Sequence, residues 1–146
     1  MPPPERIDAL IPHAGGMCLL DRIVTWDEER VVLATASHRR ADNPLRSGGR
    51  LRCVHLCEYG AQAMAVHGGL LAAAEGGRAP PGVLVSLRDV ILAADFVDGL
   101  PGELRVEAVR LHGAPGSWQY RFSVSHAGRE LARGRAAVML DRAAAG

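Results

Sequence analysis

The sequence predicts an α+β protein in which an antiparallel β-sheet wraps around one long central helix. Two strand-like segments come first, then the longest apolar stretch of the chain (residues 51–74), then four more strand-like segments. The apolar stretch is rich in Ala, Leu and Met and has few β-branched residues, which is typical of a helix. A sheet whose concave face covers this helix buries the apolar surfaces of both.

The first two strands are expected at residues 17–26 and 31–37, joined by a polar turn into a hairpin. Residues 6–10 precede them and are expected to form a short helical turn that ends at Pro12. After the hairpin, residues 38–50 contain Asn-Pro and Gly-Gly and predict an irregular loop.

The helix expected over residues 51–74 is apolar on nearly every side, so it is predicted to be buried rather than half-exposed. Three glycines, Gly60, Gly68 and Gly69, weaken it by about 1 kcal/mol each if they lie in its interior. Small residues at positions 60, 61, 63 and 65 let another surface approach the helix backbone closely.

The last four strands are expected at residues 83–96, 103–111, 118–126 and 130–140, separated by breaks rich in Gly and Pro. Ala127-Gly128 predicts a tight hairpin turn between the last two. A single sheet over one helix leaves an edge strand, and such edges pair readily with another chain. We therefore expect a dimer.

The length of 146 residues is that of one domain, so residues 1–146 are taken as a single unit, with a leader (1–10) and a tail (141–146) expected to be loose. Arginine accounts for all 17 basic residues and lysine is absent, which excludes Schiff-base chemistry. The net charge of +1 predicts no polyanion-binding face, so no nucleic-acid partner is expected.

Three irregularly spaced cysteines complete neither a disulfide framework nor a zinc site, so no metal is expected, and no motif indicates a cofactor. The N-terminus does not resemble a signal peptide. No segment approaches the roughly 20 apolar residues that cross a bilayer. These features predict a cytoplasmic protein with no membrane partner.

The polar side chains of the predicted helix are the most informative ones. His55, Glu58 and Gln62 follow each other at spacings of three and four and therefore share one stripe. A carboxylate on an apolar helix must be paired, hydrogen-bonded or protonated with a raised pKa, and the last state makes a general acid. We interpret the stripe as an acid/base site; the alternative is that Glu58 caps a loop backbone with His55 as its partner.

Two other polar residues of the helix are expected to lie outside the acid/base stripe. Tyr59 is expected in the core or at an interface. His67 lies roughly 120° from His55 around the helix axis, so it is expected to face outward near the helix end.

Three motifs occur in an order that resembles a known family. Ile11-Pro12-His13 precedes Met17-Cys18-Leu19-Leu20-Asp21-Arg22, the helix carries Glu58 followed by Ala61 and Gln62, and Pro101-Gly102-Glu103-Leu104 comes before a later strand. This set resembles the hotdog-fold 3-hydroxyacyl-acyl-carrier-protein dehydratases of fatty-acid and polyketide synthesis. Within them it is most similar to the dehydratase-like proteins of aryl-polyene-type pigment pathways.

The resemblance implies a hotdog dimer that removes water from a 3-hydroxyacyl thioester to give the 2-enoyl thioester. In the family, a tunnel at the dimer interface admits the acyl-phosphopantetheine arm of an acyl carrier protein. A loop His takes the proton beside the thioester carbonyl, an acidic helix residue of the other subunit protonates the departing hydroxyl, and a backbone amide at a helix N-terminus polarises the carbonyl. Glu58 matches the acid position.

The chain differs from this family at the position of the catalytic base. The His-Phe-Pro-Gly loop that carries the catalytic His has no counterpart, and Asn43 or Pro44 stands near that place. Asn is not a base at neutral pH. Either His55 supplies the imidazole from the turn before Glu58, or His38 swings in from the loop. We favour His55 because its spacing guarantees proximity to Glu58. His13 is expected to be structural.

The resemblance also assigns binding roles, as expectations. The substrate is expected to contact Gln62, Asn43, Gly49 and Tyr59. Within a cluster of loop arginines, Arg46, Arg50 and Arg52 are expected to dock an acidic acyl carrier protein.

Two other functions remain open. The first is a hotdog thioesterase, in which Glu58 activates water and Gln62 orients the thioester. The second is a non-catalytic partner subunit for an active hotdog relative. Whether the dimer forms with a second copy or with another hotdog subunit also stays open, as does the carrier of the acyl group.

Overall fold

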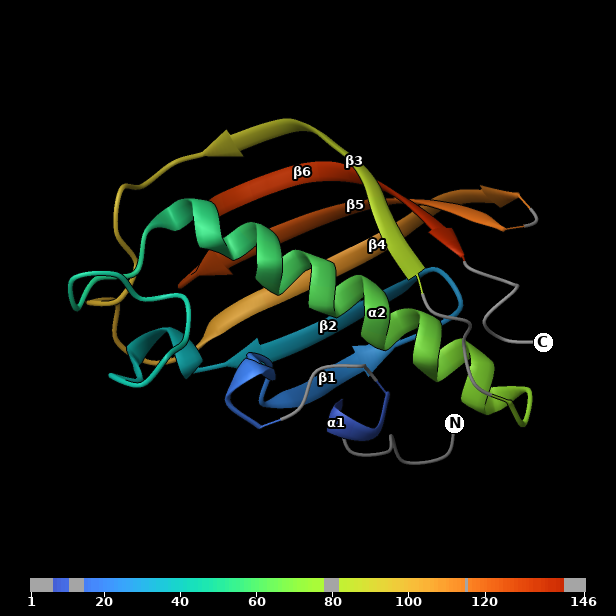
Figure 1. Ribbon diagram of the computed structural model, residues 1–146, viewed down its shortest axis with the longest axis horizontal. Coiled ribbons are helices and arrows are strands. Elements are labelled where there is room, and N and C mark those ends of the chain that lie inside the picture. Colours follow the sequence, from blue (N-terminus) through green and yellow to red (C-terminus); the bar gives the residue numbers. More distant parts are fainter. Residues whose placement is uncertain (1–6, 11–14, 78–81, 115, 141–146) are drawn as a thin grey trace.

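A computed structural model describes residues 7–10, 15–77, 82–114 and 116–140. One long helix, α2 (Leu56–Ala74), lies across one face of a six-stranded antiparallel sheet with the order β1-β2-β4-β5-β6-β3 (Figure 1). The strands are β1 (Arg22–Trp26), β2 (Arg30–Thr35), β3 (Gly82–Leu92), β4 (Leu104–Ala114), β5 (Ser117–His126) and β6 (Arg129–Leu140). Four short helical segments complete the fold: α1 (Ile7–Leu10), η1 (Gly15–Met17), η2 (Ser37–Arg39) and η3 (Cys53–His55).

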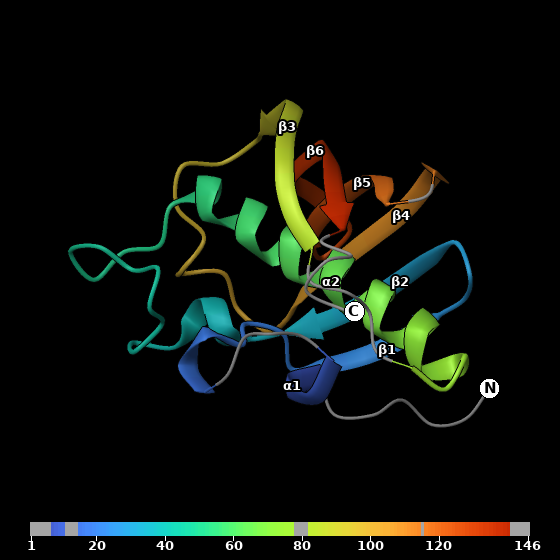
Figure 2. The ribbon, with the colours of Figure 1, turned by 45° about the vertical axis from the view of Figure 1, so that its right-hand side comes forward.

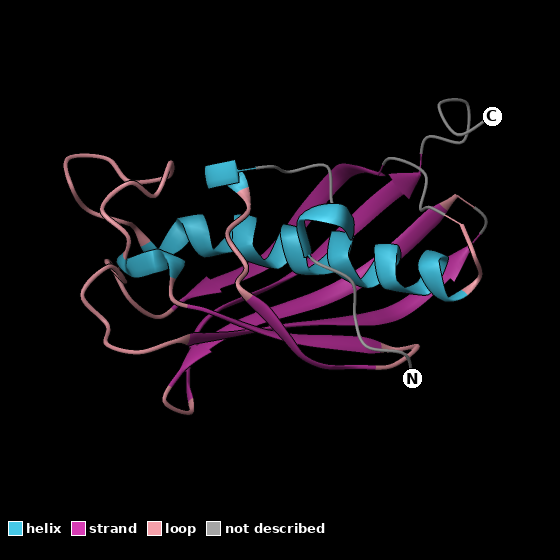
Figure 3. Cartoon of the chain, turned by 90° about the horizontal axis from the view of Figure 1, so that it is seen from below, coloured by secondary structure: helices cyan, strands magenta, loops and turns pink. Residues whose placement is uncertain are grey.

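The curved sheet and α2 form two layers, and the turned views show the helix running along the concave side (Figures 2 and 3). The predicted architecture of a sheet wrapped around one central helix is therefore confirmed. The order of strands leaves β1 and β3 as the two edges. Among the described residues, no helix is long and apolar enough to span a membrane.

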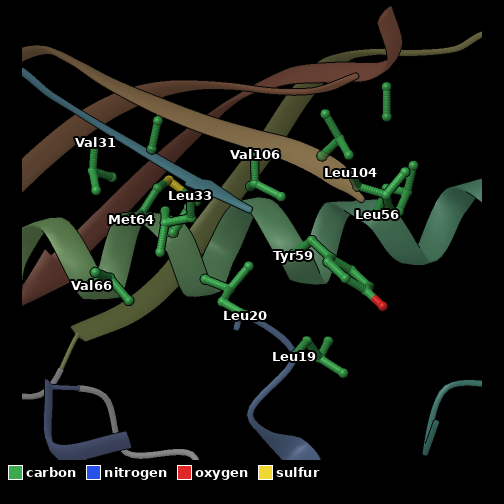
Figure 4. Close-up of a cluster of buried hydrophobic side chains, with 14 of the residues drawn as sticks. Leu19, Leu20, Val31, Leu33, Leu56, Tyr59, Met64, Val66, Leu104 and Val106 are labelled. Carbon is green, nitrogen blue, oxygen red and sulfur yellow. The ribbon is translucent and has the colours of Figure 1, made fainter. Parts of the chain in front are cut away.

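The core lies between α2 and the alternating apolar positions of the central strands (Figure 4). On the sheet side these positions have no exposed surface: Val31, Leu33, Val106, Phe122 and Val124. Burying each such side chain contributes about 1.5–3 kcal/mol relative to leaving it in water. On β4 and β5 the burial has a period of two because side chains alternate between the two faces of a strand, whereas β2 is buried at every position from 31 to 35.

The first predicted strand is wrong in its first half, because β1 begins only at Arg22. Leu19 and Leu20 are buried but lie outside the sheet. The N–H of Leu19 donates to Oε1 of Gln62, and its carbonyl accepts from Oγ1 of Thr35. A peptide group whose donor and acceptor are bonded to side chains is not available to a strand ladder.

The long helix also begins later than expected, since residues 53–55 form the 3₁₀ turn η3. The N–H of Cys53 donates to the carbonyl of Asp95 at 2.8 Å, and Arg52 forms a β-bridge with Phe96. These contacts replace the end of the strand expected over residues 83–96, which stops at Leu92. They also place the start of α2 beside the segment that follows the edge strand β3.

His67 is buried, which corrects the prediction that it faces outward. Its Nε2 lies 2.8 Å from the carbonyl of Asp27, and its Nδ1 lies 2.8 Å from the hydroxyl of Tyr120. A carbonyl only accepts, so Nε2 carries the proton and Nδ1 accepts from the tyrosine. Burial lowers the pKa of His67 and raises the pKa of Tyr120 to about 12. The neutral imidazole thus links α2, β5 and the β1–β2 turn.

Gly60 confirms the expected close approach to the helix. A Cβ at this position would lie 2.5 Å from Cγ and Cδ2 of Phe122 on β5, whereas a Cβ at Gly68 would meet nothing within 4 Å. The other glycine-dependent expectation, the β5–β6 turn, is confirmed by positive φ angles at both Ala127 (50°) and Gly128 (82°).

Replacing Gly60 tests this packing. Gly60→Ala is expected to destabilise the fold by about 1–3 kcal/mol, because the new methyl group must displace the ring of Phe122. Gly68→Ala, in the same helix, is expected to stabilise it by about 0.5–1 kcal/mol through helix propensity alone. Urea unfolding curves measure both. Equal effects at the two positions would contradict the close approach at Gly60.

The buried imidazoles predict a pH dependence of stability. His67 and the buried His38 both have pKa values lowered by burial, so the unfolded chain binds more protons below about pH 6.5. Above that pH the two imidazoles are not expected to lower the free energy of unfolding. Towards pH 5 it should fall by up to about 1.4 kcal/mol per pH unit for each imidazole.

The measurement is urea unfolding of the wild-type chain and of His67→Gln between about pH 7 and pH 5, a range in which ordinary carboxylates stay ionised. The variant should show a shallower slope, because only His38 then contributes in this way. An unchanged slope would show that His67 does not carry the effect.

Candidate functional site

The polar stripe (His55, Glu58 and Gln62) contacts the segment just before β1 through Gln62. The amide Nε2 donates to the carbonyl of Met17 at 2.7 Å and to Oε1 of Glu58 at 3.4 Å, while Oε1 accepts from the N–H of Leu19 at 2.9 Å. Gln62 has no exposed surface. Glu58 lies in the first turn of α2 and is half-buried as a residue. Gln62 thus ties Glu58 to residues 17–19.

His55 precedes α2 as the last residue of η3, three positions before Glu58, and is half-buried. Its ring forms no hydrogen bond or ion pair with any residue that the structure describes. The two titratable groups expected to carry the chemistry lie on successive turns at the N-terminal end of the buried helix.

Tyr59 lies next to Glu58 and belongs to a buried chain of hydrogen bonds (its hydroxyl points away from the apolar cluster in Figure 4). Nδ2 of Asn43 donates to the tyrosine oxygen at 3.0 Å, and the tyrosine oxygen lies 2.8 Å from Oγ of Ser37. Ser37 in turn donates to the carbonyl of Leu19 at 2.6 Å. The serine proton is used by that carbonyl, so Tyr59 donates to Ser37. Burial raises the pKa of Tyr59 and keeps this donor protonated.

The substrate contacts expected for Asn43, Tyr59 and Gln62 stay predictions; what the structure adds is their internal hydrogen bonds. All three are buried, and their polar atoms are bonded inside the protein. Asn43 also accepts from the N–H of Leu45 through Oδ1. Through these bonds the three residues position the loop and the helix. Gly49 is different: it is exposed, with φ of 76°, in the turn between Ser47 and Arg50. Its contact with substrate stays a prediction.

His38, the alternative base, is held in place by its surroundings. It is buried, and its Nε2 donates to the carbonyl of Leu100 at 2.9 Å. Swinging toward Glu58 would leave that carbonyl without this donor, at a cost of about 1–3 kcal/mol. The role of His55 as the base stays a prediction. His13, expected to be structural, lies outside the described residues.

The three docking arginines differ in what they contact. Arg46 is half-buried and donates to the carbonyls of His38 and Gly49, so it holds the loop, and its role in docking stays a prediction. Arg50 and Arg52 are exposed and lie over the ring of Phe96, at 4.0 and 5.2 Å from its centroid. Arg50 also pairs with Asp98 at 3.0 Å.

The sequence did not indicate several of these partners. Thr35 and Ser37 donate to the carbonyl of Leu19, and the ring of Phe96 lies under Arg50 and Arg52. None of the three belongs to a motif. The signal that was available is the pair of polar residues at the end of a strand that is otherwise buried throughout. Such groups must find hydrogen-bond partners.

The long helix and the antiparallel strand order define this protein as a hotdog-fold protein. A family model described as "ApeP-like: ApeP dehydratase" matches residues 5–145, so the chain belongs to the ApeP-like family. The resemblance inferred from the sequence motifs is confirmed. Among curated proteins, no sequence matches the chain.

Solved structures share the fold over most of the chain. A chain of the dehydratase heterocomplex ApeI:P from Xenorhabdus doucetiae is 21% identical with a TM-score of 0.81, covering 92% of this chain and 90% of that one. AziG from S. sahachiroi is 22% identical (TM-score 0.61, coverage 85% and 91%). A hypothetical thioesterase with coenzyme A from Streptococcus pneumoniae TIGR4 is 13% identical (TM-score 0.62, coverage 82% and 84%). These likenesses establish the hotdog fold.

The two tyrosines offer a matched test of the buried network. Tyr59→Phe and Tyr120→Phe each remove one buried hydroxyl and are expected to cost about 1–2 kcal/mol in urea unfolding. Only Tyr59→Phe should loosen the loop, because only Tyr59 accepts from Asn43, which in turn holds Leu45. Hydrogen exchange of the Leu45 amide measures this. Equal exchange in both variants would contradict the role given to Tyr59.

Proposed function

We propose that the chain acts as a dehydratase on 3-hydroxyacyl thioesters borne by an acyl carrier protein, in the biosynthesis of aryl-polyene-type pigments. Membership of a family described as a dehydratase supports the reaction class. The observation that carries the residue assignment is the placement of Glu58 and His55 on successive turns at the start of the buried helix, with Glu58 held by Gln62.

In the proposed reaction, His55 takes the proton from C2, beside the thioester carbonyl. The electron pair of the broken C2–H bond forms the C2=C3 double bond while the C3–O bond breaks. Glu58, in its protonated form, donates its proton to the departing hydroxyl, which leaves as water. The enzyme is left with a protonated His55 and an ionised Glu58, and a proton transfer from one to the other restores the starting state.

The site is proposed to be completed by a second hotdog subunit at the edge strand β3. Five large apolar side chains of β3 are exposed, at 36–50% of their surface: Leu84, Leu87, Val90, Ile91 and Leu92. An unpaired apolar edge of this kind is a pairing surface. Because the start of α2 is tied to residues 95 and 96, just past β3, a subunit bound there lies beside His55 and Glu58. The heterocomplex formed by the similar ApeI:P chain supports such a partner.

Arg50 and Arg52 are proposed to receive the acidic carrier protein. Their guanidinium groups are exposed, share the Phe96 ring as a platform and lie immediately before the helix that carries the site. A carrier bound there would deliver its acyl arm close to Glu58. Arginine suits this role because its planar fork binds carboxylates and phosphates in two places.

The test is an assay of the purified chain, alone and with a hotdog partner subunit, on 3-hydroxyacyl-carrier protein followed by mass spectrometry. Loss of one water is the expected product signature. Glu58→Gln and His55→Asn are each expected to lower turnover about 100-fold or more. Glu75→Gln, at the exposed end of the same helix, is the matched control and should keep wild-type turnover.

The competing functions give different products in the same assay. Release of a free thiol would instead establish a thioesterase, in which Glu58 activates water. Turnover that needs the partner and is unaffected by Glu58→Gln would make this chain a non-catalytic subunit. Either result contradicts the acid role proposed for Glu58.

A further inference from the structure

Asp98, in the connection between β3 and β4, stands opposite Arg50 in a short antiparallel pairing. Arg52 forms a β-bridge with Phe96, and continuing that pairing by two residues along each segment brings Arg50 opposite Asp98. Because side chains alternate along an extended backbone, the two arginines and their two partners point to the same side. They form one surface cluster, in which both guanidinium groups lie over the ring of Phe96.

The residues between these positions face the core. Leu51 and Val97 have no exposed surface, and the N–H of Val97 donates to the carbonyl of Leu51 at 2.9 Å. The two buried side chains hold both segments against the rest of the protein. The cluster of exposed side chains above them therefore has a fixed base.

The carboxylate of Asp98 is itself held by the backbone. In an antiparallel pair, Leu51 and Val97 would exchange two hydrogen bonds, but the carbonyl of Val97 accepts from the N–H of Leu100 at 3.2 Å. The N–H of Leu51 donates instead to Oδ1 of Asp98, at 3.0 Å. This bond, together with Arg50, keeps the pKa of Asp98 below its usual value, so the carboxylate is ionised at neutral pH.

The held carboxylate binds the guanidinium of Arg50 at one atom only. Nε of Arg50 lies 3.1 Å from Oδ1 and 3.0 Å from Oδ2 of Asp98. Among the residues that the structure describes, none accepts a hydrogen bond from Nη1 or Nη2 of Arg50. Arg46, in the same loop, uses both of its Nη atoms on backbone carbonyls. Arg50 thus keeps the pair of Nη groups that binds a carboxylate or a phosphate in two places.

We propose that Asp98 is a positioning residue for recognition of the carrier protein, which holds the guanidinium of Arg50 over Phe96 with its Nη groups turned toward the incoming partner. The inference rests on the docking role proposed above for Arg50 and Arg52. An arginine that is fixed before its partner arrives loses less conformational freedom on binding. Asp98 therefore adds to the affinity for an acidic protein although its own charge repels that protein.

These two effects of the carboxylate have opposite signs, which makes its role measurable. By charge alone, removing an acidic group from a surface that binds an acidic protein tightens binding. Removing the positioning frees the side chain of Arg50 and weakens binding. Asp98→Asn removes the charge but keeps an oxygen that can accept from the N–H of Leu51. This variant is expected to weaken binding of the carrier protein by about 2- to 10-fold.

The measurement is the dissociation constant of a fluorescently labelled acyl carrier protein, obtained from anisotropy with the wild-type chain, Asp98→Asn, Arg50→Gln and the double variant. If Asp98 acts through Arg50, the double variant binds no more weakly than Arg50→Gln alone. Glu103→Gln is the matched control, because it also removes a carboxylate from an ion pair, with Arg22 at 2.8 Å. This control should not weaken binding.

Turnover gives a second readout. On 3-hydroxyacyl-carrier protein, Asp98→Asn should raise KM and leave kcat unchanged, because neither Asp98 nor Arg50 contacts the reacting atoms in the proposed reaction. On 3-hydroxyacyl-pantetheine, a thioester without the carrier protein, KM and kcat should both keep their wild-type values. A purely structural defect would instead lower kcat on both substrates.

The outcomes separate the positioning role from the proposed function. Unchanged or tighter binding by Asp98→Asn, or additive losses in the double variant, overturns the positioning role and leaves docking at Arg50 standing. Wild-type affinity in Arg50→Gln overturns the docking site and, with it, the role of Asp98. A chain that binds the carrier protein but releases no water contradicts only the dehydratase activity, and the dissociation constants still decide the role of Asp98.

Discussion

The peptide group of Leu19 is held from both sides by buried side chains, and the position of the site depends on this arrangement. Gln62 accepts from its N–H, while Thr35 and Ser37 donate to its carbonyl. A buried peptide group left without such partners costs more than the bonds themselves yield. The three side chains therefore lock the segment before β1 against the long helix and against the end of β2. That lock determines where Glu58 lies relative to the loop.

The same requirement for satisfied polar groups explains why the loop is ordered without the histidine of the dehydratase family. Asn43 uses its amide to bind Ser37, Tyr59 and the backbone of Leu45. Each bond in the chain from Asn43 through Tyr59 to Ser37 polarises the next, so the network is stronger than its separate members. Under the proposed function, the chemistry then falls to the residues at the start of the helix, His55 and Glu58.

The net charge of the chain does not show how its charged side chains are grouped on the surface. A net charge of +1 predicted no anion-binding face, yet the strand register gathers Arg88, Arg135 and Arg121 at the open edge of the sheet. Three other arginines, Arg30, Arg105 and Arg133, pair with glutamates in the same sheet. The exposed apolar side chains of β3 and this group of arginines thus lie at the same edge of the sheet.

The sequence by itself determined the class of fold and the family. Period-two alternation and one apolar helical stretch indicate the layers, and ordered motifs at 11–22, 58–64 and 101–104 indicate the family, because both signals are local in the chain. The structure decided the strand that starts at Arg22, the burial of His67 and the internal roles of Asn43, Tyr59 and Gln62. These depend on hydrogen bonds between residues up to 53 positions apart, such as His67 to Tyr120. Which partner a buried polar group hydrogen-bonds to depends on residues that only the folded chain brings together, so a local sequence pattern does not predict it.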